Sequence, residues 1–217
     1  MPNWIPKPEW KEQAAFLIGG GSSLRGFDFS LLKGKNTIGC NQAFRLGPEV
    51  VQYCLFGDSG FWQKNQVDLS KFPGKVVTCT PVLQSKPVPW LLQMRRIRDG
   101  LHEGNILGWN YSTGAAAINL AVSLGAHRIY LLGYDLGVLP ETTPPGKLSS
   151  HWHTHYPNIT KDYAFQRFLR GFNTVAASLK QHYPHVEVIN VTDGSSKLDV
   201  FPKISQSALL SVLKEGS

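Results

Sequence analysis

The chain has 217 residues, which is enough for one large domain or two small ones, and for a sizeable core. Hydrophobic residues make up 42% and charged residues 17%, a balance that excludes a disordered chain. The formal net charge of +7 suits an anionic ligand such as a nucleotide, a sugar acid or a nucleic acid, although the basic residues are scattered. No apolar run approaches the ~20 residues of a membrane span, and the first residues lack the apolar stretch of a secretory signal.

Short apolar runs bounded by Gly, Pro, Asn or Asp predict buried strands. These runs cover residues 14–19, 36–41, 50–58, 75–80, 128–135 and 186–192.

Helical patterns lie between and after these runs. Residues 113–125 predict a helix of small residues that ends at Gly125, and residues 205–216 predict a short closing helix. Residues 162–183 predict a longer helix, because its apolar side chains fall on one stripe. That stripe consists of Phe165, Phe168, Leu169, Phe172, Val175, Ala176 and Leu179.

Strands that alternate with helices predict an α/β fold with a mostly parallel sheet and helices on both faces. We expect a single Rossmann-like domain over residues 1–217, with long loops at about 81–112 and 136–161. In such a sheet the ligand binds beyond the carboxyl ends of the strands, and long loops there carry chemistry.

The three cysteines, Cys40, Cys54 and Cys79, each lie in a strand-like stretch. Their odd number and dispersed positions predict buried reduced thiols in a cytoplasmic protein, with no zinc site. The densest basic cluster is Arg95, Arg96 and Arg98. On a helix these arginines would point in different directions, which argues against one phosphate-binding face.

Two motifs follow the first two predicted strands. Gly20 and Gly21 lie in a glycine-rich turn whose amides, with the hydroxyl of Ser22, could hold a phosphate. Asn41, between Cys40 and Gln42, could read a base edge or a ribose hydroxyl. The alternatives are a plain glycine turn and an Asx turn or helix cap.

Two further motifs precede predicted or possible helices. Asp58 could accept a sugar hydroxyl or bind a metal, or it could cap the next helix. Thr113 and Gly114 begin the small-residue helix, where free amides and the helix dipole favour a negative group. Ordinary capping by Ser112 or Thr113 is the alternative.

Three of the seven histidines, His151, His153 and His155, lie within five residues of the second long loop. Imidazole transfers protons near neutral pH and also binds zinc, but flanking Asp or Cys ligands are missing here. A solvated polar loop is the alternative. Asp135 ends the preceding strand and could orient a ligand or a histidine.

Together, the segments GGGSSL, GCNQAF, STGAAAINLAVSLGAHRIYLLGYDL and SHWHTH fall in an order that resembles the bacterial CMP-sialic-acid-dependent sialyltransferases. The order also resembles the related motility accessory factor and MptE-like (6-hydroxymethylpterin pyrophosphokinase-like) families. The resemblance covers residues 14–60 and 112–205 and does not convincingly cover residues 81–111.

The resemblance implies that nucleotide contacts come from Gly20, Gly21, Asn41, Thr113 and Gly114. It also implies that His155 is the general base, with His151 at the matching upstream position.

The sequence departs from the sialyltransferase pattern at three places. Gly20 and Asp58 stand where those enzymes carry asparagines, and a tyrosine expected near Gly137 is missing. Asp58 would instead suit a cation-bridged phosphate, as in the pyrophosphokinase-like relatives.

We therefore expect a transferase that moves a sugar from a nucleotide-sugar donor to a hydroxyl acceptor, with a histidine base. The first alternative is Mg²⁺-dependent phosphoryl or pyrophosphoryl transfer through Asp58 or Asp135. The second is a nucleotide-binding module without activity. No tightly bound cofactor or structural metal is expected, Mg²⁺ entering only with the first alternative. A nucleic acid is a conceivable acceptor that nothing in the sequence indicates.

Overall fold

The computed structural model describes residues 3–137, 151–153, 155, 161–194 and 196–215. Within them an eight-stranded sheet runs in the order β10-β9-β8-β1-β2-β3-β4-β5, and its paired strands are parallel. The strands are β1 (Ala14–Ile18), β2 (Thr37–Cys40), β3 (Tyr53–Phe56), β4 (Lys75–Thr78), β5 (Leu92–Gln93), β8 (Arg128–Leu132), β9 (Glu187–Val191) and β10 (Lys203–Ile204). A separate parallel pair consists of β6 (Arg95–Ile97) and β7 (Ile106–Gly108).

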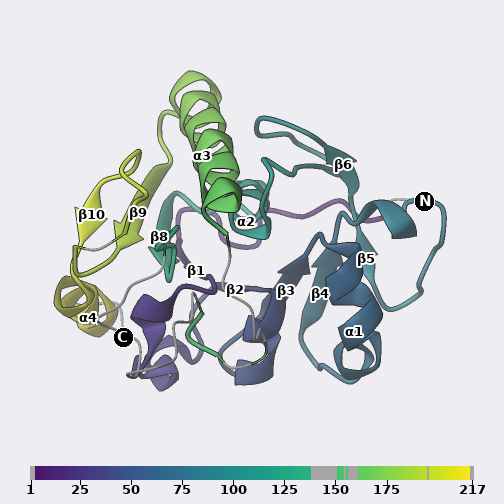
Figure 1. Ribbon diagram of the computed structural model, residues 1–217, viewed down its shortest axis with the longest axis horizontal. Coiled ribbons are helices and arrows are strands. Elements are labelled where there is room, and N and C mark those ends of the chain that lie inside the picture. The colour runs from purple at the N-terminus through teal and green to yellow at the C-terminus, as the bar shows by residue number, and fades with distance from the viewer. Residues whose placement is uncertain (1–2, 138–150, 154, 156–160, 195, 216–217) are drawn as a thin grey trace.

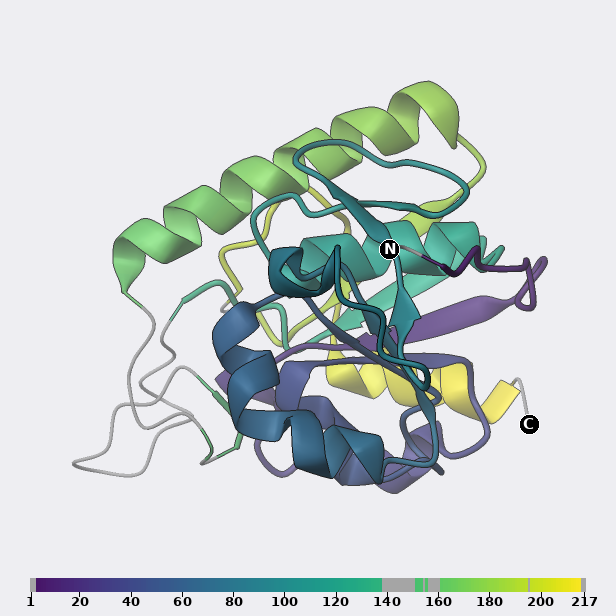
Figure 2. The ribbon, with the colours of Figure 1, turned by 90° about the vertical axis from the view of Figure 1, so that its right-hand side faces the viewer.

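In the described part of the chain, four α-helices cover the sheet: α1 (Ser59–Ser70), α2 (Thr113–Ser123), α3 (Asp162–His182) and α4 (Gln206–Glu215). Figures 1 and 2 show α2 and α3 on one side of the sheet and α1 and α4 on the other. Short 3-10 turns occupy η1 (Ser22–Leu24), η2 (Phe29–Leu32), η3 (Asn41–Leu46) and η4 (Pro81–Leu83).

The alternation of side chains along β1 explains why both faces of the sheet need helices. Leu17 packs in the core under α2 and α3, whereas Phe16 and Ile18 pack in the opposite core. Successive side chains of a strand point to opposite faces, so a strand that is apolar at every position must be covered twice. The fold is therefore the expected α/β arrangement, with a mostly parallel sheet between two helical layers.

The order of the strands places a binding crevice near β1. β2 lies on one side of β1 and β8 on the other, so the direction in which the chain adds strands reverses at β1. In doubly wound sheets, ligands bind beyond the carboxyl ends of the strands at such a reversal. The glycine-rich turn that begins at Gly19 directly follows β1 and lies at this point.

The six predicted strands are confirmed as β1, β2, β3, β4, β8 and β9, and the three predicted helices are confirmed as α2, α3 and α4. The predicted stripe of α3 is buried or packs against the core. The structure adds helix α1 and, within residues 81–112, strands β5, β6 and β7. Most of the predicted loop at 136–161 lies outside the described residues. Within the described part of the chain, the helices lack the combination of length and apolar character that crossing a membrane requires.

Candidate functional site

A cavity of about 470 Å³ opens at the carboxyl edge of the sheet. The segments that follow β1, β2, β3 and β8 line it, together with the start of α2. It collects most of the residues singled out in the sequence: Gly20, Gly21, Asn41, Asp58, Thr113, Gly114, Asp135 and His151. Two other candidate residues from the sequence, Ser22 and His155, do not line it. The side chain of Ser22 is fully buried, and His155 is exposed.

The glycine-rich turn is held by contacts to the segment after β8. The Gly21 amide donates to the Gly133 carbonyl at 2.8 Å. A Cβ on Gly21 would lie 2.5 Å from Cγ of Asp135 and 2.6 Å from the Gly133 oxygen. A glycine is therefore required at position 21 by close packing against Gly133 and Asp135, whether or not a ligand binds there.

Asp135 fastens this turn with its side chain. Its carboxylate accepts one hydrogen bond from the Ser23 amide at 2.9 Å and another from Ser23 Oγ at 2.5 Å. Burial raises the pKa of the Asp135 carboxyl, and the hydrogen bonds from Ser23 oppose that rise. Asp135 thus orients the glycine-rich turn.

Residues 151–153, which we call the histidine strap, lie directly against the same turn. The Trp152 amide donates to the Gly20 carbonyl at 3.0 Å, and Trp152 Nε1 donates to the Gly19 carbonyl at 2.9 Å. Nη2 of Arg25 donates to the His151 carbonyl at 2.9 Å. These bonds bring His151 and His153 to the wall of the cavity.

The three histidine rings lie in a row. The ring centroids of His151 and His153 are 5.4 Å apart, and those of His153 and His155 are 5.6 Å apart. Burial lowers the pKa of His151, and burial with the charges of its neighbours lowers the pKa of His153 to about 3. Both cavity histidines are therefore neutral at physiological pH, and His153 is only a weak base.

Asn41 and the start of α2 face each other across the cavity. The Thr113 hydroxyl donates to Oδ1 of Asn41 at 3.4 Å. Ser112 caps α2 by accepting a bond from the Ala115 amide, and the first two residues of the helix, Thr113 and Gly114, line the cavity. The helix start therefore favours a negative group there.

Backbone strain also gathers around the cavity. Asn41, Tyr111 and Leu136 line it with positive φ angles of 52°, 65° and 51°. Such conformations cost about 1–3 kcal/mol each for ordinary residues and cluster at functional sites.

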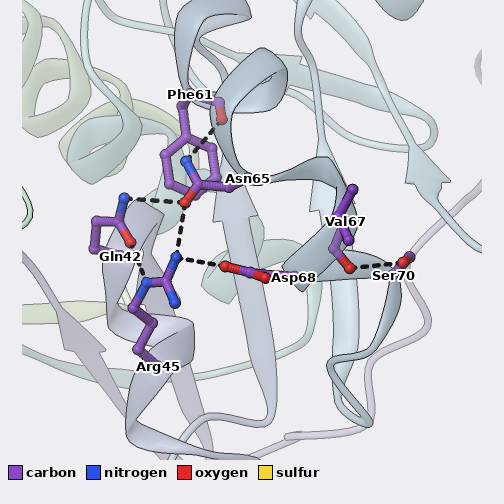
Figure 3. Close-up of polar contacts among 7 residues, drawn as sticks. All are labelled: Gln42, Arg45, Phe61, Asn65, Val67, Asp68 and Ser70. Carbon is purple, nitrogen blue, oxygen red and sulfur yellow. Dashed lines mark hydrogen bonds and ion pairs between the residues drawn. The ribbon is translucent and has the colours of Figure 1, made fainter.

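Gln42, the residue after Asn41, has a structural role (Figure 3). Its Nε2 donates to Oδ1 of Asn65 at 3.2 Å, and its Oε1 accepts from Nε of Arg45 at 2.8 Å. Arg45 also pairs with Asp68 at 2.7 Å. This network joins the turn after β2 to helix α1, which fixes Asn41 in place.

The sequence reasoning missed a basic and aromatic side of the cavity. It consists of Arg96 from β6, Trp109 and Tyr111 after β7, and Arg167 with Phe165, Phe168 and Phe172 from α3. The arginine cluster at 95–98 lies within the segment expected as a long loop, and the argument against one binding face holds only for a helix. Arg95 and Arg96 lie on strand β6, where successive side chains point to opposite faces, so Arg96 can face the cavity without Arg95.

Asp58 lies among these positive charges. It precedes α1, but its side chain makes no capping hydrogen bond. Loss of water in the cavity wall raises the pKa of its carboxyl, while the charges of Arg96 and Arg167 lower it. Among the described residues, no three His, Cys, Asp or Glu side chains converge as a metal site would require. The charges of two guanidinium groups already act on Asp58, and the Asp135 carboxylate already accepts hydrogen bonds from Ser23. These surroundings suit Mg²⁺ poorly.

The cysteines are free and buried, as expected, and burial raises the pKa of the Cys40 thiol to about 12. Cys40 lines the cavity and lies 3.8 Å from the Tyr134 hydroxyl. A thiol held protonated in this way is not a nucleophile at neutral pH.

No protein-family model and no curated protein matches the chain. Among solved structures, it is similar to the sialyltransferase CstII from Campylobacter jejuni in complex with a substrate analogue, cytidine-5'-monophosphate. The TM-score is 0.51 at 15% identity, covering 89% of this chain and 85% of that one. A second match is the apo α-2,3-sialyltransferase from Campylobacter jejuni, with a TM-score of 0.48 at 18% identity, covering 91% and 84%. The chain has a sialyltransferase-like fold.

Proposed function

We propose that this protein is a nucleotide-sugar-dependent glycosyltransferase that moves a sugar to a hydroxyl acceptor. One observation carries the proposal: a single cavity at the strand reversal joins the glycine-rich turn, Asn41, the start of α2 and two neutral histidines. The shared fold supports it, because the matched CstII structure contains cytidine-5'-monophosphate.

In the proposed reaction, the acceptor oxygen forms a bond to the anomeric carbon of the donor sugar. The bond between that carbon and the phosphate oxygen breaks, and the nucleotide leaves with the electron pair. The acceptor proton passes to a histidine. The amides at Thr113 and Gly114 stabilise the charge that grows on the departing phosphate.

We propose His155 as the base, with His151 as the alternative. The resemblance to sialyltransferases assigns His155, and its exposed side chain is open to an acceptor that arrives from solvent. His151 lines the cavity and would serve an acceptor that enters more deeply. The two assignments differ in a way that mutagenesis separates.

The first test is a thermal-shift screen of nucleotides and nucleotide sugars, because ligands that bind the folded state raise its melting temperature. With the donor identified, His155→Ala should lower kcat about 10²–10⁴-fold and leave nucleotide affinity nearly intact. His182→Ala, at the far end of α3, is the matched control. Loss of turnover in His151→Ala alone would move the base to His151, and full turnover in both variants would refute both assignments.

A further inference from the structure

One side of the cavity, which none of the motifs recognised in the sequence supplies, is built by residues 94–111. Strands β6 and β7 pair in parallel, and two buried asparagines fix this segment to its surroundings. Asn110 donates to the Gly100 carbonyl and accepts from the Gly100 amide, both at 2.8 Å. Asn119 of α2 accepts from the Gly108 amide at 2.8 Å. The segment is therefore a firm support and not a loose loop.

This support holds the Arg96 side chain in a defined position. The guanidinium carbon lies 3.8 Å from the centroid of the Trp109 ring, and Nη1 donates to the Gly57 carbonyl at 3.1 Å. The indole lies so close to Gly57 that a Cβ there would come within 2.0 Å of it. Gly57, Trp109 and Arg96 therefore form a stack that orders the guanidinium before any ligand arrives.

Within the described residues, most N–H donors of Arg96 make no hydrogen bond. An arginine carries five N–H donors, and within the described residues only Nη1 of Arg96 makes a hydrogen bond. Arg167 approaches from α3 and lines the same cavity, with its guanidinium 5.7 Å from the Phe168 ring centroid. Both arginines act on Asp58, so the two positive charges gather at one side of the cavity.

We propose that Arg96 and Arg167 form an anion-binding subsite for the charged oxygens of the nucleotide sugar, either its phosphate or a carboxylate on its sugar. The proposal rests on the proposed function and names the residues that recognise the donor's charge. The amides at the start of α2 border the same cavity and favour the same sign of charge. Two arginines beside an aromatic wall suit a planar or branched oxyanion, because guanidinium groups donate in pairs.

The experiment measures the affinity of the wild type, Arg96→Gln and Arg167→Gln for CMP, cytidine, CMP-N-acetylneuraminate and inorganic pyrophosphate by calorimetry. Arg95→Gln and Arg170→Gln are matched controls, because both side chains are exposed and neither lines the cavity. If the subsite holds the phosphate, each cavity variant loses about 10–100-fold in CMP affinity, and cytidine binding is unchanged. If it holds a carboxylate, CMP binding is unchanged and only CMP-N-acetylneuraminate binding falls.

The outcomes separate this subsite from the proposed function. Wild-type affinities in both cavity variants for all four probes would overturn the subsite and leave the proposed function standing. Pyrophosphate binding that depends on the arginines, without binding of CMP or CMP-N-acetylneuraminate, would support an anion site and contradict a cytidine nucleotide sugar as the donor. If the wild type binds none of the probes, the subsite proposal fails, and the thermal-shift screen of other nucleotides decides the proposed function. Should Arg96→Gln lose its fold through the Trp109 stack, Arg167→Gln and Arg96→Lys decide the matter, since Arg167 makes no hydrogen bond or ion pair with the described residues.

Discussion

The contact between the glycine-rich turn and the segment after β8 can be tested with Gly21→Ala. The new Cβ would lie 2.5 Å from Cγ of Asp135, whereas carbon atoms normally approach to about 3.5 Å, so the segments must separate by roughly 1 Å. Over-packing of this kind costs about 1–3 kcal/mol. The movement would also stretch the hydrogen bonds from Ser23 to Asp135, and bonds to a charged group contribute about 1.5–3 kcal/mol.

We expect Gly21→Ala to lower the free energy of unfolding by about 3 kcal/mol, because the hydrogen bonds weaken without being lost entirely. For a chain of this size, that corresponds to a fall in melting temperature of about 6–12 °C. Urea denaturation with calorimetry measures both quantities. Gly60→Ala is the control, because its Cβ meets open space in helix α1 and should be neutral or slightly stabilising. Equal stability of Gly21→Ala and the wild type would refute the packing argument.

Two further predictions concern the surroundings of the cavity. Asn65→Ala should destabilise the protein by about 1–3 kcal/mol in urea denaturation, because Gln42 loses its buried acceptor, and Lys64→Ala should not; equal effects of both substitutions would contradict this. Burial lowers the pKa of His153 in the folded chain from 6.5 to about 3. Below pH 6.5 the unfolded chain therefore binds a proton at this residue, whereas the folded chain does not. The free energy of unfolding therefore falls as pH falls below 6.5. Between about pH 7 and pH 4, it should fall less in His153→Gln than in the wild type. Parallel pH profiles of the two proteins would show that His153 is not the group responsible.

The central sheet was predictable because its strands are short, apolar and bounded by turn residues. The six predicted strands are buried at every position after the first, so their composition alone separates them from the polar connections. The same logic placed the glycine-rich turn, Asn41 and Thr113 together, since the carboxyl ends of parallel strands share one edge. Helix α1 escaped prediction because its buried side chains, Phe61, Asn65 and Leu69, make only a weak apolar stripe.

The basic side of the cavity could not be predicted because its residues lie far apart in the sequence. Arg96 and Arg167 are separated by 71 positions and reach the cavity from a strand pair and a helix that no local pattern relates. The strands β6 and β7 have three residues each, too few for a periodic signal. The roles of His155 and of the nucleotide-binding residues, and the resemblance to MptE-like families, stay predictions.

The most direct test of the proposed function is the release of free nucleotide from a nucleotide sugar, measured with and without a hydroxyl acceptor and in the presence of EDTA. The account predicts release that the acceptor accelerates and that EDTA leaves unchanged, because the cavity supplies helix amides and arginines in place of a metal ion. Release that requires Mg²⁺ would contradict it in favour of phosphoryl transfer. Tight nucleotide binding without any turnover would contradict it in favour of a binding module.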